Sequence, residues 1–227
     1  QFDSAIRNQT FGWDEQADIY ATEAHGDATS TTFTVHVADQ TEEITIPVPG
    51  KYNVQNALIA IAIGLEFEVS MPAIKEGLAN MQLTKNRLEW LEGKNDIQLL
   101  NDAYNASPSS MKAVLNYFAE TDLPGEKIIV LGDIRELGEA SKQFHEDISQ
   151  EIDLRTYKAV FLYGEEMRAL YEKLRGRENA ERVKHFTGEK DALIEAIEKT
   201  AASGDSVLFK SSNGTDLLSV VEKLRKD

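Results

Sequence analysis

Residues 127–133 decide the fold, and they read Lys127-Ile128-Ile129-Val130-Leu131-Gly132-Asp133. Four consecutive apolar residues without alternation indicate a strand that is buried on both faces. Strands of this kind belong to parallel sheets that carry helices on both sides. The stretch therefore predicts an α/β fold, with Gly132 and Asp133 at the point where the strand leaves the sheet.

The alternation of strand and helix continues on both sides of this run. The predicted strands cover residues 97–101, 127–131, 159–163, 183–186 and 206–209. The predicted helices cover residues 108–120, 139–152, a segment that ends near 174, 189–202 and 215–226. Five strand–helix pairs predict a parallel sheet with helices on both faces. Because ligands of such sheets bind at the carboxyl ends of the strands, polar residues just after each strand are the candidates for a site.

Residues 1–83 follow a different pattern and are predicted to form a separate part from residues 84–227. Alternating apolar residues predict strands at 31–37 and 43–49, with a hairpin turn at Asp39-Gln40. Helical spacing then predicts helices over 53–67 and 71–81, the second with Ser70 as its N-cap and Pro72 in its first turn. These few elements are interpreted as the tail of a larger domain.

The composition excludes several classes of protein. The 227 residues carry a net charge of −15 and have a pI near 4.7, which disfavours binding to a nucleic-acid polymer, because a phosphate backbone requires a basic face. Without cysteine, neither disulfides nor thiolate sites are available. No apolar run approaches the roughly 18 residues of a membrane span, and the N-terminus shows no signal peptide. We therefore expect a cytoplasmic protein without membrane insertion, and the missing initiator Met indicates a cut inside a longer protein.

The loop after the first of the five strands holds three candidates, Asp102, Tyr104 and Asn105. An aspartate can accept two hydrogen bonds from a ribose diol, and an asparagine can bind an amide or carboxylate edge. The alternative is a polar loop in which Ser107 caps the helix that Pro108 begins. The cap explains only Ser107 and Pro108, so both interpretations stay open for the three candidates.

The loop after the second strand, residues 132–139, places Asp133 and Glu136 where a substrate can lie. Its glycines are six residues apart and do not match the G-x-G-x-x-G spacing of dinucleotide-binding loops. Spacing alone therefore favours an ordinary connection between a strand and a helix.

The loop after the last strand, residues 210–215, combines Lys210 with the hydroxyls of Ser211 and Ser212 at the start of a helix. A cation, hydroxyls and free backbone N–H groups together can bind an anion. A helix cap by Asn213 or Thr215 is an alternative of equal weight.

Asn53 and Asn56 lie one turn apart on one face of a predicted helix. An asparagine amide can pair with the N6/N7 edge of adenine, although Asn53 can also be the N-cap of that helix. Arg87 lies where the two parts meet and can reach phosphate or ribose, while an exposed surface charge is its ordinary interpretation. The four histidines show no metal-ligand spacing, and no G-x-x-x-x-G-K-[ST] phosphate loop occurs.

Taken together, these segments resemble the Mur ligases. The resemblance rests, in chain order, on Gly50-Lys51-Tyr52-Asn53-Val54-Gln55-Asn56-Ala57-Leu58, Asn86-Arg87-Leu88-Glu89, Asp102-Ala103-Tyr104-Asn105-Ala106-Ser107-Pro108-Ser109-Ser110-Met111, Val130-Leu131-Gly132-Asp133 with Glu136-Leu137-Gly138-Glu139, and Leu208-Phe209-Lys210 with Asn213-Gly214. The third and fourth stretches are the specific ones, and they are most similar to the family members that add D-Ala-D-Ala. The resemblance extends from Thr10 to the last helix.

The resemblance implies that the chain is the C-terminal half of an ATP-dependent amide ligase. Residues 84–227 would be a Rossmann-like C-terminal domain, and residues 1–83 the second half of a central α/β ATPase domain whose phosphate loop lies upstream. ATP and Mg²⁺ are the implied cofactors, with the metal ligands upstream. The implied substrates are UDP-N-acetylmuramoyl-tripeptide and D-Ala-D-Ala, which a monomeric enzyme joins through an acyl phosphate in peptidoglycan precursor synthesis. The chain alone is expected to be inactive, with no catalytic residue and no metal ligand of its own.

The resemblance also implies roles for the candidates. Asn56 would contact adenine, with Asn53 supporting it, and Arg87 and Asp102 would hold the ribose and a nearby phosphate, with Tyr104 and Asn105 beside them. The residues facing the dipeptide would be Asp133, Glu136, Lys210, Ser211 and Ser212, with Lys210 as the partner of its carboxylate.

Two positions depart from the family pattern. Tyr52 stands where many members have histidine, which puts any histidine-specific role in doubt. Lys-Ser-Ser-Asn-Gly at 210–214 replaces the usual Lys-Gly-Ser-Arg, so an arginine contact is not carried over. Two other functions stay open: another Mur ligase or a folylpolyglutamate-synthase-like ligase, and a non-catalytic nucleotide-binding or interaction module.

Overall fold

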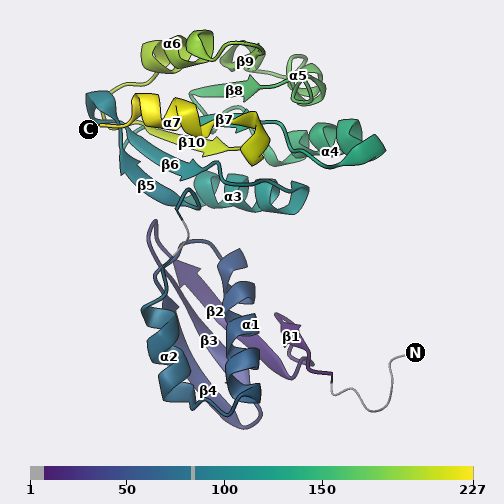
Figure 1. Ribbon diagram of the computed structural model, residues 1–227, viewed down its shortest axis with the longest axis vertical. Coiled ribbons are helices and arrows are strands. Elements are labelled where there is room, and N and C mark those ends of the chain that lie inside the picture. The colour runs from purple at the N-terminus through teal and green to yellow at the C-terminus, as the bar shows by residue number, and fades with distance from the viewer. Residues whose placement is uncertain (1–7, 83–84, 227) are drawn as a thin grey trace. The chain divides into compact units, whose positions relative to one another are not determined.

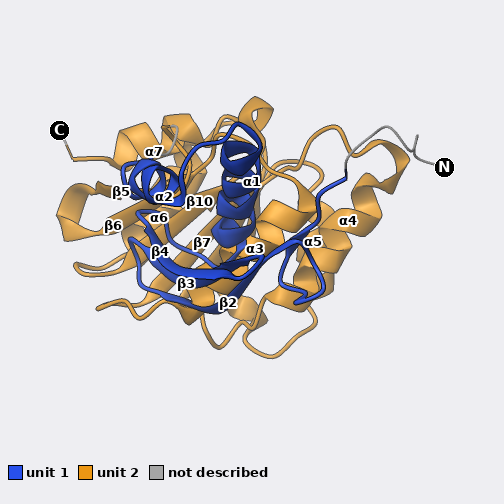
Figure 2. Ribbon diagram, turned by 90° about the horizontal axis from the view of Figure 1, so that it is seen from below, with its two compact units in different colours: residues 1–82 blue, residues 83–227 orange. Residues whose placement is uncertain are grey.

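The computed structural model describes residues 8–82 and 85–226, and the chain divides into two compact units, residues 1–82 and 83–227. Figure 1 shows the elements of each unit, and Figure 2 gives the units separate colours. Each unit has a sheet of its own, so the two are described one at a time.

The sheet of residues 83–227 has six strands in the order β5-β6-β10-β7-β8-β9 (Figure 1). Every neighbouring pair is parallel except β5 and β6, which are antiparallel. The strands are β5 (Glu89–Glu92), β6 (Gln98–Asp102), β7 (Lys127–Gly132), β8 (Ala159–Tyr163), β9 (Val183–Phe186) and β10 (Ser206–Lys210). The carboxyl ends of β6, β10 and β7 are therefore neighbours in the middle of the sheet.

Helices cover both faces of this sheet because the chain reverses its direction across it. The helices are α3 (Pro108–Glu120), α4 (Ser141–Asp147), α5 (Arg168–Leu174), α6 (Asp191–Thr200) and α7 (Leu218–Leu224). From β6 to β9 the chain advances in one direction, and α6 then carries it back to β10 in the centre. Since such connections are right-handed, α6 lies on the face opposite to α3, α4 and α5.

The core on the α6 and α7 side is one continuous apolar cluster. Leu193 and Ile197 of α6, with Val220 and Val221 of α7, pack in the same cluster as the sheet residue Phe209. All five are fully buried. Alternate strand residues point to the opposite face, so both sides of each central strand are apolar and the sheet is held between two layers of helices.

The sheet of residues 1–82 has four strands in the order β1-β2-β3-β4. They are β1 (Phe11–Gly12), β2 (Ile19–Gly26), β3 (Thr31–Val37) and β4 (Gln40–Ile46); β1 is parallel to β2, and the other pairs are antiparallel. The helices α1 (Tyr52–Glu66) and α2 (Met71–Ala79) pack on this sheet. Alternate sheet residues are buried, among them Ile19, Phe33 and Ile44, and they form the core of the unit.

The parallel sheet and all five strand–helix pairs predicted from the sequence are confirmed, with differences at their ends. The helix predicted over 139–152 is shorter, because the 3-10 turns η2 (Gly138–Ala140) and η3 (Ile148–Glu151) flank α4. The last helix begins at Leu218 and not at 215, since η5 (Asn213–Thr215) precedes it. Neither Asn213 nor Thr215 caps that helix; its N-cap is Leu217, without a side-chain hydrogen bond.

Other expectations were incomplete or shifted. Strands β1, β2 and β5 were not predicted; β2 has a register shift between Thr22 and His25 that interrupts its alternation. The strand predicted at 43–49 runs from Gln40 to Ile46, so the hairpin turn lies at residues 38–39. The remaining short 3-10 turns are η1 (Lys94–Asp96) and η4 (Ala180–Arg182).

Candidate functional site

An ion pair joins the carboxyl ends of β6 and β10. The Lys210 ammonium lies 2.8 Å from Oδ2 of Asp102 and donates to the Asn105 carbonyl at 2.6 Å. Both side chains are nearly buried, with 4% of Lys210 and 12% of Asp102 exposed. Adjacent parallel strands bring these two residues into direct register. Lys210 is therefore committed to groups of the protein, and its charge stabilises this edge of the sheet.

Asp102 accepts few hydrogen bonds for a buried carboxylate. Its Oδ1 receives the Leu88 backbone N–H at 3.2 Å, and its Oδ2 receives Lys210. Burial raises the pKa of Asp102, and Lys210, the Leu88 N–H and Arg87 oppose this shift only in part. A carboxylate oxygen can accept about two hydrogen bonds, so Asp102 has acceptor capacity left for a ligand.

The segment 86–88 is fastened to the end of β6 and presents Arg87. The buried Asn101 side chain donates to Oδ1 of Asn86 at 2.9 Å, and the Tyr104 N–H donates to the Asn86 carbonyl at 3.2 Å. Asn86 and Leu88 both have positive φ, 63° and 47°, a backbone that persists only where its surroundings hold it. The fixed segment places the exposed guanidinium of Arg87 over the Tyr104 ring, 4.7 Å from its centroid.

A second cluster links the ends of β7 and β10. The carbonyl of Asp133 accepts the Ser212 N–H and the Thr215 hydroxyl, both at 3.1 Å. The Ser212 hydroxyl accepts the Arg135 N–H at 2.9 Å. Two loops that are distant in the sequence are thereby fixed to each other at the middle of the sheet.

The Asp133 side chain is turned into the protein. Its Oδ1 accepts the Met167 N–H at 3.0 Å, and its Oδ2 lies 3.7 Å from the Arg135 guanidinium. Burial raises the pKa of Asp133, and the Met167 N–H is the largest opposing cause. Gly164, at a φ of 114°, passes so close that a Cβ there would collide with the carboxylate. Arg135 and Glu136, by contrast, are exposed.

Ser211 is fully buried, and its hydroxyl has no hydrogen-bond partner within the described part of the chain. Ser211 lies directly against Gly132, where a Cβ would come within 2.8 Å of the serine Cβ. Close packing of these two residues therefore requires glycine at 132.

In residues 1–82 the start of α1 holds the two predicted asparagines. Asn53 is buried and donates to the Pro49 carbonyl at 2.7 Å, while its Oδ1 accepts from Nδ2 of Asn56 at 3.0 Å. The N-cap of α1 is Lys51, so the alternative of Asn53 as N-cap is wrong. Asn56 is exposed and retains its amide oxygen and one N–H for a ligand.

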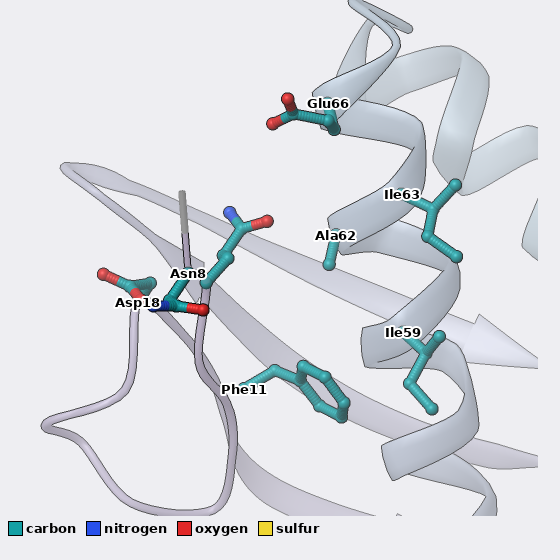
Figure 3. Close-up of a pocket in the computed structure, with 8 residues that line it drawn as sticks. Asn8, Phe11, Asp18, Ile59, Ala62, Ile63 and Glu66 are labelled. Atoms are coloured by element: carbon teal, nitrogen blue, oxygen red, sulfur yellow. The ribbon is translucent and has the colours of Figure 1, made fainter. Parts of the chain in front are cut away.

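Two pockets lie in the same unit. One of about 520 Å³ is lined by Trp13, Ala24, Lys51, Tyr52 and Gln55, around the start of α1. The other, of about 400 Å³, has the apolar side chains Phe11, Ile59, Ala62 and Ile63, with Asn8, Gln9, Asp18 and Glu66 around them (Figure 3). Neither pocket is lined by Asn53 or Asn56, so these two asparagines form a separate feature at the helix start.

The structure thus places the candidates in three groups. The first is Arg87, Asp102, Tyr104, Asn105 and Lys210; the second is Asp133, Glu136, Ser211 and Ser212; and the third is Asn53 with Asn56. Sequence reasoning did not predict the contacts by which Asn86, Asn101, His145 and Thr215 position other groups. Among these four residues, only Asn101 carried a signal in the sequence, because it is an asparagine inside an otherwise apolar strand.

The next feature is the grouping of possible metal ligands among the described residues. Within residues 8–82 and 85–226, no group of three or more His, Cys, Asp or Glu side chains could hold a metal ion. Mg²⁺ prefers oxygen ligands in an octahedral arrangement and usually takes several of them from water and substrate phosphates. Over the same residues, no helix is both long and apolar enough to cross a bilayer.

A doubly wound α/β domain with its polar residues at the carboxyl ends of the central strands defines a class of ligand-binding proteins. The family comparison narrows this class. Residues 86–213 match the family model described as Mur ligase, glutamate ligase domain, and residues 2–64 match the Mur ligase middle domain. The chain belongs to the Mur ligase family.

Individual relatives point to one branch of that family. The chain is 34% identical, over 97% of its length, to UDP-N-acetylmuramoyl-tripeptide–D-alanyl-D-alanine ligase of Bacillus subtilis, of which it covers 48%. It is 29% identical to the ligase of that name from Escherichia coli, over 93% of this chain and 45% of the relative. A crystal structure of MurF from Acinetobacter baumannii is similar with a TM-score of 0.81 and 30% identity, over 95% of this chain and 46% of that one. The chain spans about half the length of these relatives.

Proposed function

We propose that the chain is the C-terminal half of a cytoplasmic ATP-dependent ligase that joins D-Ala-D-Ala to UDP-N-acetylmuramoyl-tripeptide. The observation that carries the proposal is the convergence of Arg87, Asp102, Lys210, Ser212 and Asp133 at the central strand ends, in a chain similar along nearly its whole length to ligases of that name. This edge is where doubly wound sheets bind ligands.

The reaction proposed for the whole enzyme has two steps. A carboxylate oxygen of the tripeptide attacks the γ-phosphorus of ATP, ADP leaves, and an acyl phosphate forms. The free amine of D-Ala-D-Ala then attacks the acyl carbon; the C–N bond forms, the C–O bond to phosphate breaks, and the amine loses a proton as phosphate leaves. Because water would hydrolyse the acyl phosphate, the site must exclude it.

The residues of the first group fit the nucleotide in this proposal. Asp102 has free acceptor capacity for a ribose hydroxyl, and the exposed Arg87 guanidinium offers donors to phosphate or ribose. Tyr104 is 44% exposed and supports the guanidinium, and the Asn105 side chain lies exposed beside it. Asn56 is proposed to contact adenine, with Asn53 fixing its amide.

The second group is assigned to the amino substrate. The backbone of residues 133–135 is held by Ser212 and Thr215, so the loop is rigid where the dipeptide is proposed to lie. The ion pair of Lys210 with Asp102 supports a role in fixing this edge. Asp102 and Asn105 take two of the three ammonium donors, so a direct contact with the dipeptide carboxylate would use the third. Asp133, Glu136, Ser211 and Ser212 remain the proposed neighbours of the dipeptide.

The proposal is tested by amide formation in the full-length ligase. With ATP, Mg²⁺ and UDP-N-acetylmuramoyl-tripeptide, we expect phosphate release and a ligated product, detected by mass spectrometry, to require D-Ala-D-Ala. Free D-Ala, L-Lys, D-Glu and L-Glu serve as matched controls. Efficient ligation of a single amino acid, and none of the dipeptide, would favour the alternative Mur or folylpolyglutamate-type ligase.

The 227-residue chain alone separates the ligase from a binding module. The phosphate loop does not occur in its sequence, so we expect no turnover and weak or undetectable ATP binding by calorimetry. ATP binding by this chain as strong as that of the full-length protein would favour the non-catalytic module.

A further inference from the structure

The loop that follows β7 depends on side chains from other elements for its backbone hydrogen bonds. Glu136 and Gly138 have positive φ, 67° and 57°, so the loop does not continue the sheet ladder. The N–H of Arg135 is bound by Ser212. The N–H of Ile134 donates to Nε2 of His145 on α4 at 3.1 Å.

The hydrogen bonds of His145 define its chemical form. A backbone N–H is only a donor, so Nε2 must carry a lone pair. Nδ1 lies 2.8 Å from the Ser141 carbonyl, which is only an acceptor, so Nδ1 must carry the proton. His145 is therefore the neutral imidazole with its proton on Nδ1, and both ring nitrogens are occupied by the protein.

A catalytic role does not fit this arrangement. The His145 side chain is 0% exposed, and neither nitrogen is available to a substrate. A buried polar ring with both nitrogens bonded connects two elements rigidly, because losing either partner would leave a buried group unsatisfied. The ring joins the first turn of α4 to the loop residue Ile134.

We propose that His145 is the positioning residue of the loop after β7, residues 132–139, which is assigned to the amino substrate. Its Nδ1–H tautomer fixes the Ile134 amide and hence the direction in which the Arg135 and Glu136 side chains point. The proposal rests on the proposed function for its effect on substrate use. Its structural part, the tautomer and the fixed Ile134 amide, can be measured without any activity.

Three variants separate the two nitrogens. His145→Gln places an amide oxygen near the Nε2 position and can still accept the Ile134 N–H. His145→Asn reaches only the Nδ1 position and keeps the Ser141 contact. His145→Leu provides neither contact and stays apolar. His36→Asn, on β3, is the matched control, since it replaces a histidine that contacts Thr22 and Thr41 in residues 1–82.

The first measurement is NMR of the 227-residue chain. In the unmodified protein we expect imidazole ¹⁵N shifts with the proton on Nδ1; an Nε2–H tautomer or an imidazolium would overturn the proposal. Exchange of the Ile134 amide should be roughly ten- to a hundredfold faster in His145→Asn and His145→Leu, and slow in His145→Gln and His36→Asn. Equal protection of Ile134 in all four variants would also overturn it. Amides of β8 report whether each variant is folded.

The second measurement is kinetics of the full-length ligase. His145→Asn and His145→Leu should raise KM for the amino substrate about tenfold or more and change KM for ATP less than twofold, with His145→Gln close to the unmodified enzyme. Equal effects on both KM values would reduce His145 to a stability role and overturn the positioning proposal. Absence of dipeptide ligation in the unmodified enzyme would instead refute the proposed function and leave the NMR result standing.

Discussion

Two ion pairs with buried carboxylates lie at the two ends of β10, one at its amino end and one at its carboxyl end. They differ in how many hydrogen bonds the carboxylate accepts from the protein. At the amino end, Asp205 accepts Lys158 at 2.8 Å and the N–H groups of Glu126 and Ala202, both at 2.9 Å. At the carboxyl end, Asp102 accepts Lys210 at 2.8 Å and one N–H, that of Leu88. The amino end closes its hydrogen bonds within the protein, and the carboxyl end leaves capacity for a ligand.

The pKa values follow this difference. Burial raises the pKa of Asp102 above its ordinary value. Burial acts in the same direction on Asp205, but the hydrogen bonds from Lys158, Ala202 and Glu126 outweigh it and lower its pKa. Groups whose ionised form is costly gather at functional sites, so the comparison distinguishes a structural edge of the sheet from a candidate binding edge.

The largest expected effect comes from removing the cation of each pair. Lys210→Met should lower the free energy of unfolding by about 3–5 kcal/mol, because it leaves Asp102 buried without its charge partner. Lys158→Met should cost about 1–2 kcal/mol, because Asp205 keeps two backbone N–H groups and Lys158 is 26% exposed. Urea unfolding of the 227-residue chain measures both.

Two further variants test the cause of that difference. Lys142→Met removes a cation that is 81% exposed and 3.9 Å from Glu146, and should change stability by less than about 0.5 kcal/mol. The double variant Asp102→Leu with Lys210→Met should recover much of the lost stability, because no buried charge remains. Equal costs for Lys210→Met and Lys158→Met would remove the contrast between the two ends.

The next effect concerns one glycine at the carboxyl ends of the strands and one at their amino ends. Gly164, after β8, has a φ of 114°, and an added Cβ would collide with the Asp133 carboxylate; Gly204, before β10, has a φ of 88° and open space around it. Gly164→Ala should therefore cost about 3 kcal/mol, from backbone strain and overpacking together. Gly204→Ala should cost about 1 kcal/mol, from strain alone. Thermal unfolding compares them, and a larger cost at Gly204 would contradict the close approach of Gly164 to Asp133.

The sequence predicted most strands of the six-stranded sheet well, and it predicted the contacts at the carboxyl ends of these strands poorly. Residues 128–131 and 159–163 carry their own pattern, since burial on both faces makes a strand apolar throughout. The edge strand β5, Glu-Trp-Leu-Glu, is short and only partly buried. Its pairing with β6 depends on tertiary structure and not on a local pattern. Its pattern was therefore too weak to predict.

The candidate site divides in the same way. Asp102 and Lys210 were identified because polar residues follow apolar strands, but their pairing depends on β10 lying beside β6, which a linear pattern does not define. Asn101 and His145 were missed because their partners are distant in the sequence: Asn101 donates to the Asn86 side chain, and His145 accepts the Ile134 N–H. The positive φ of Asn86, Leu88 and Glu136 likewise results from tertiary contacts. The assigned roles of all these residues remain proposals.

A smaller effect is expected for exposed arginines. Arg87→Ala should lower the free energy of unfolding by less than about 1 kcal/mol, the value of an exposed cation–π contact, while raising KM for ATP in the full-length ligase roughly tenfold. Arg155 is the matched control at the amino edge, 78% exposed and paired with Asp153 at 2.7 Å. Arg155→Ala should leave KM for ATP unchanged. An ATP effect of the same size in both variants would show that Arg87 acts through general charge.

The smallest effect requires no substitution, only a change of pH. The folded-state pKa of Asp102 lies above the ordinary 3.8, so its contribution to stability is complete below about pH 3.8 and is lost as pH rises through the folded-state value. The folded-state pKa of Asp205 lies below 3.8, so its contribution is complete above about pH 3.8 and is lost as pH falls through that value.

Titration of the side-chain carboxyl ¹³C shifts in the 227-residue chain measures both midpoints. Asp153, whose pKa the Arg155 side chain lowers to about 2, provides an internal reference for a carboxylate that is stabilised at the surface. We expect Asp102 to titrate above 3.8 and Asp205 below it. If Asp102 titrated below 3.8, its lone pairs would already be satisfied within the protein, and the carboxyl edge would lose the property that separates it from the amino edge.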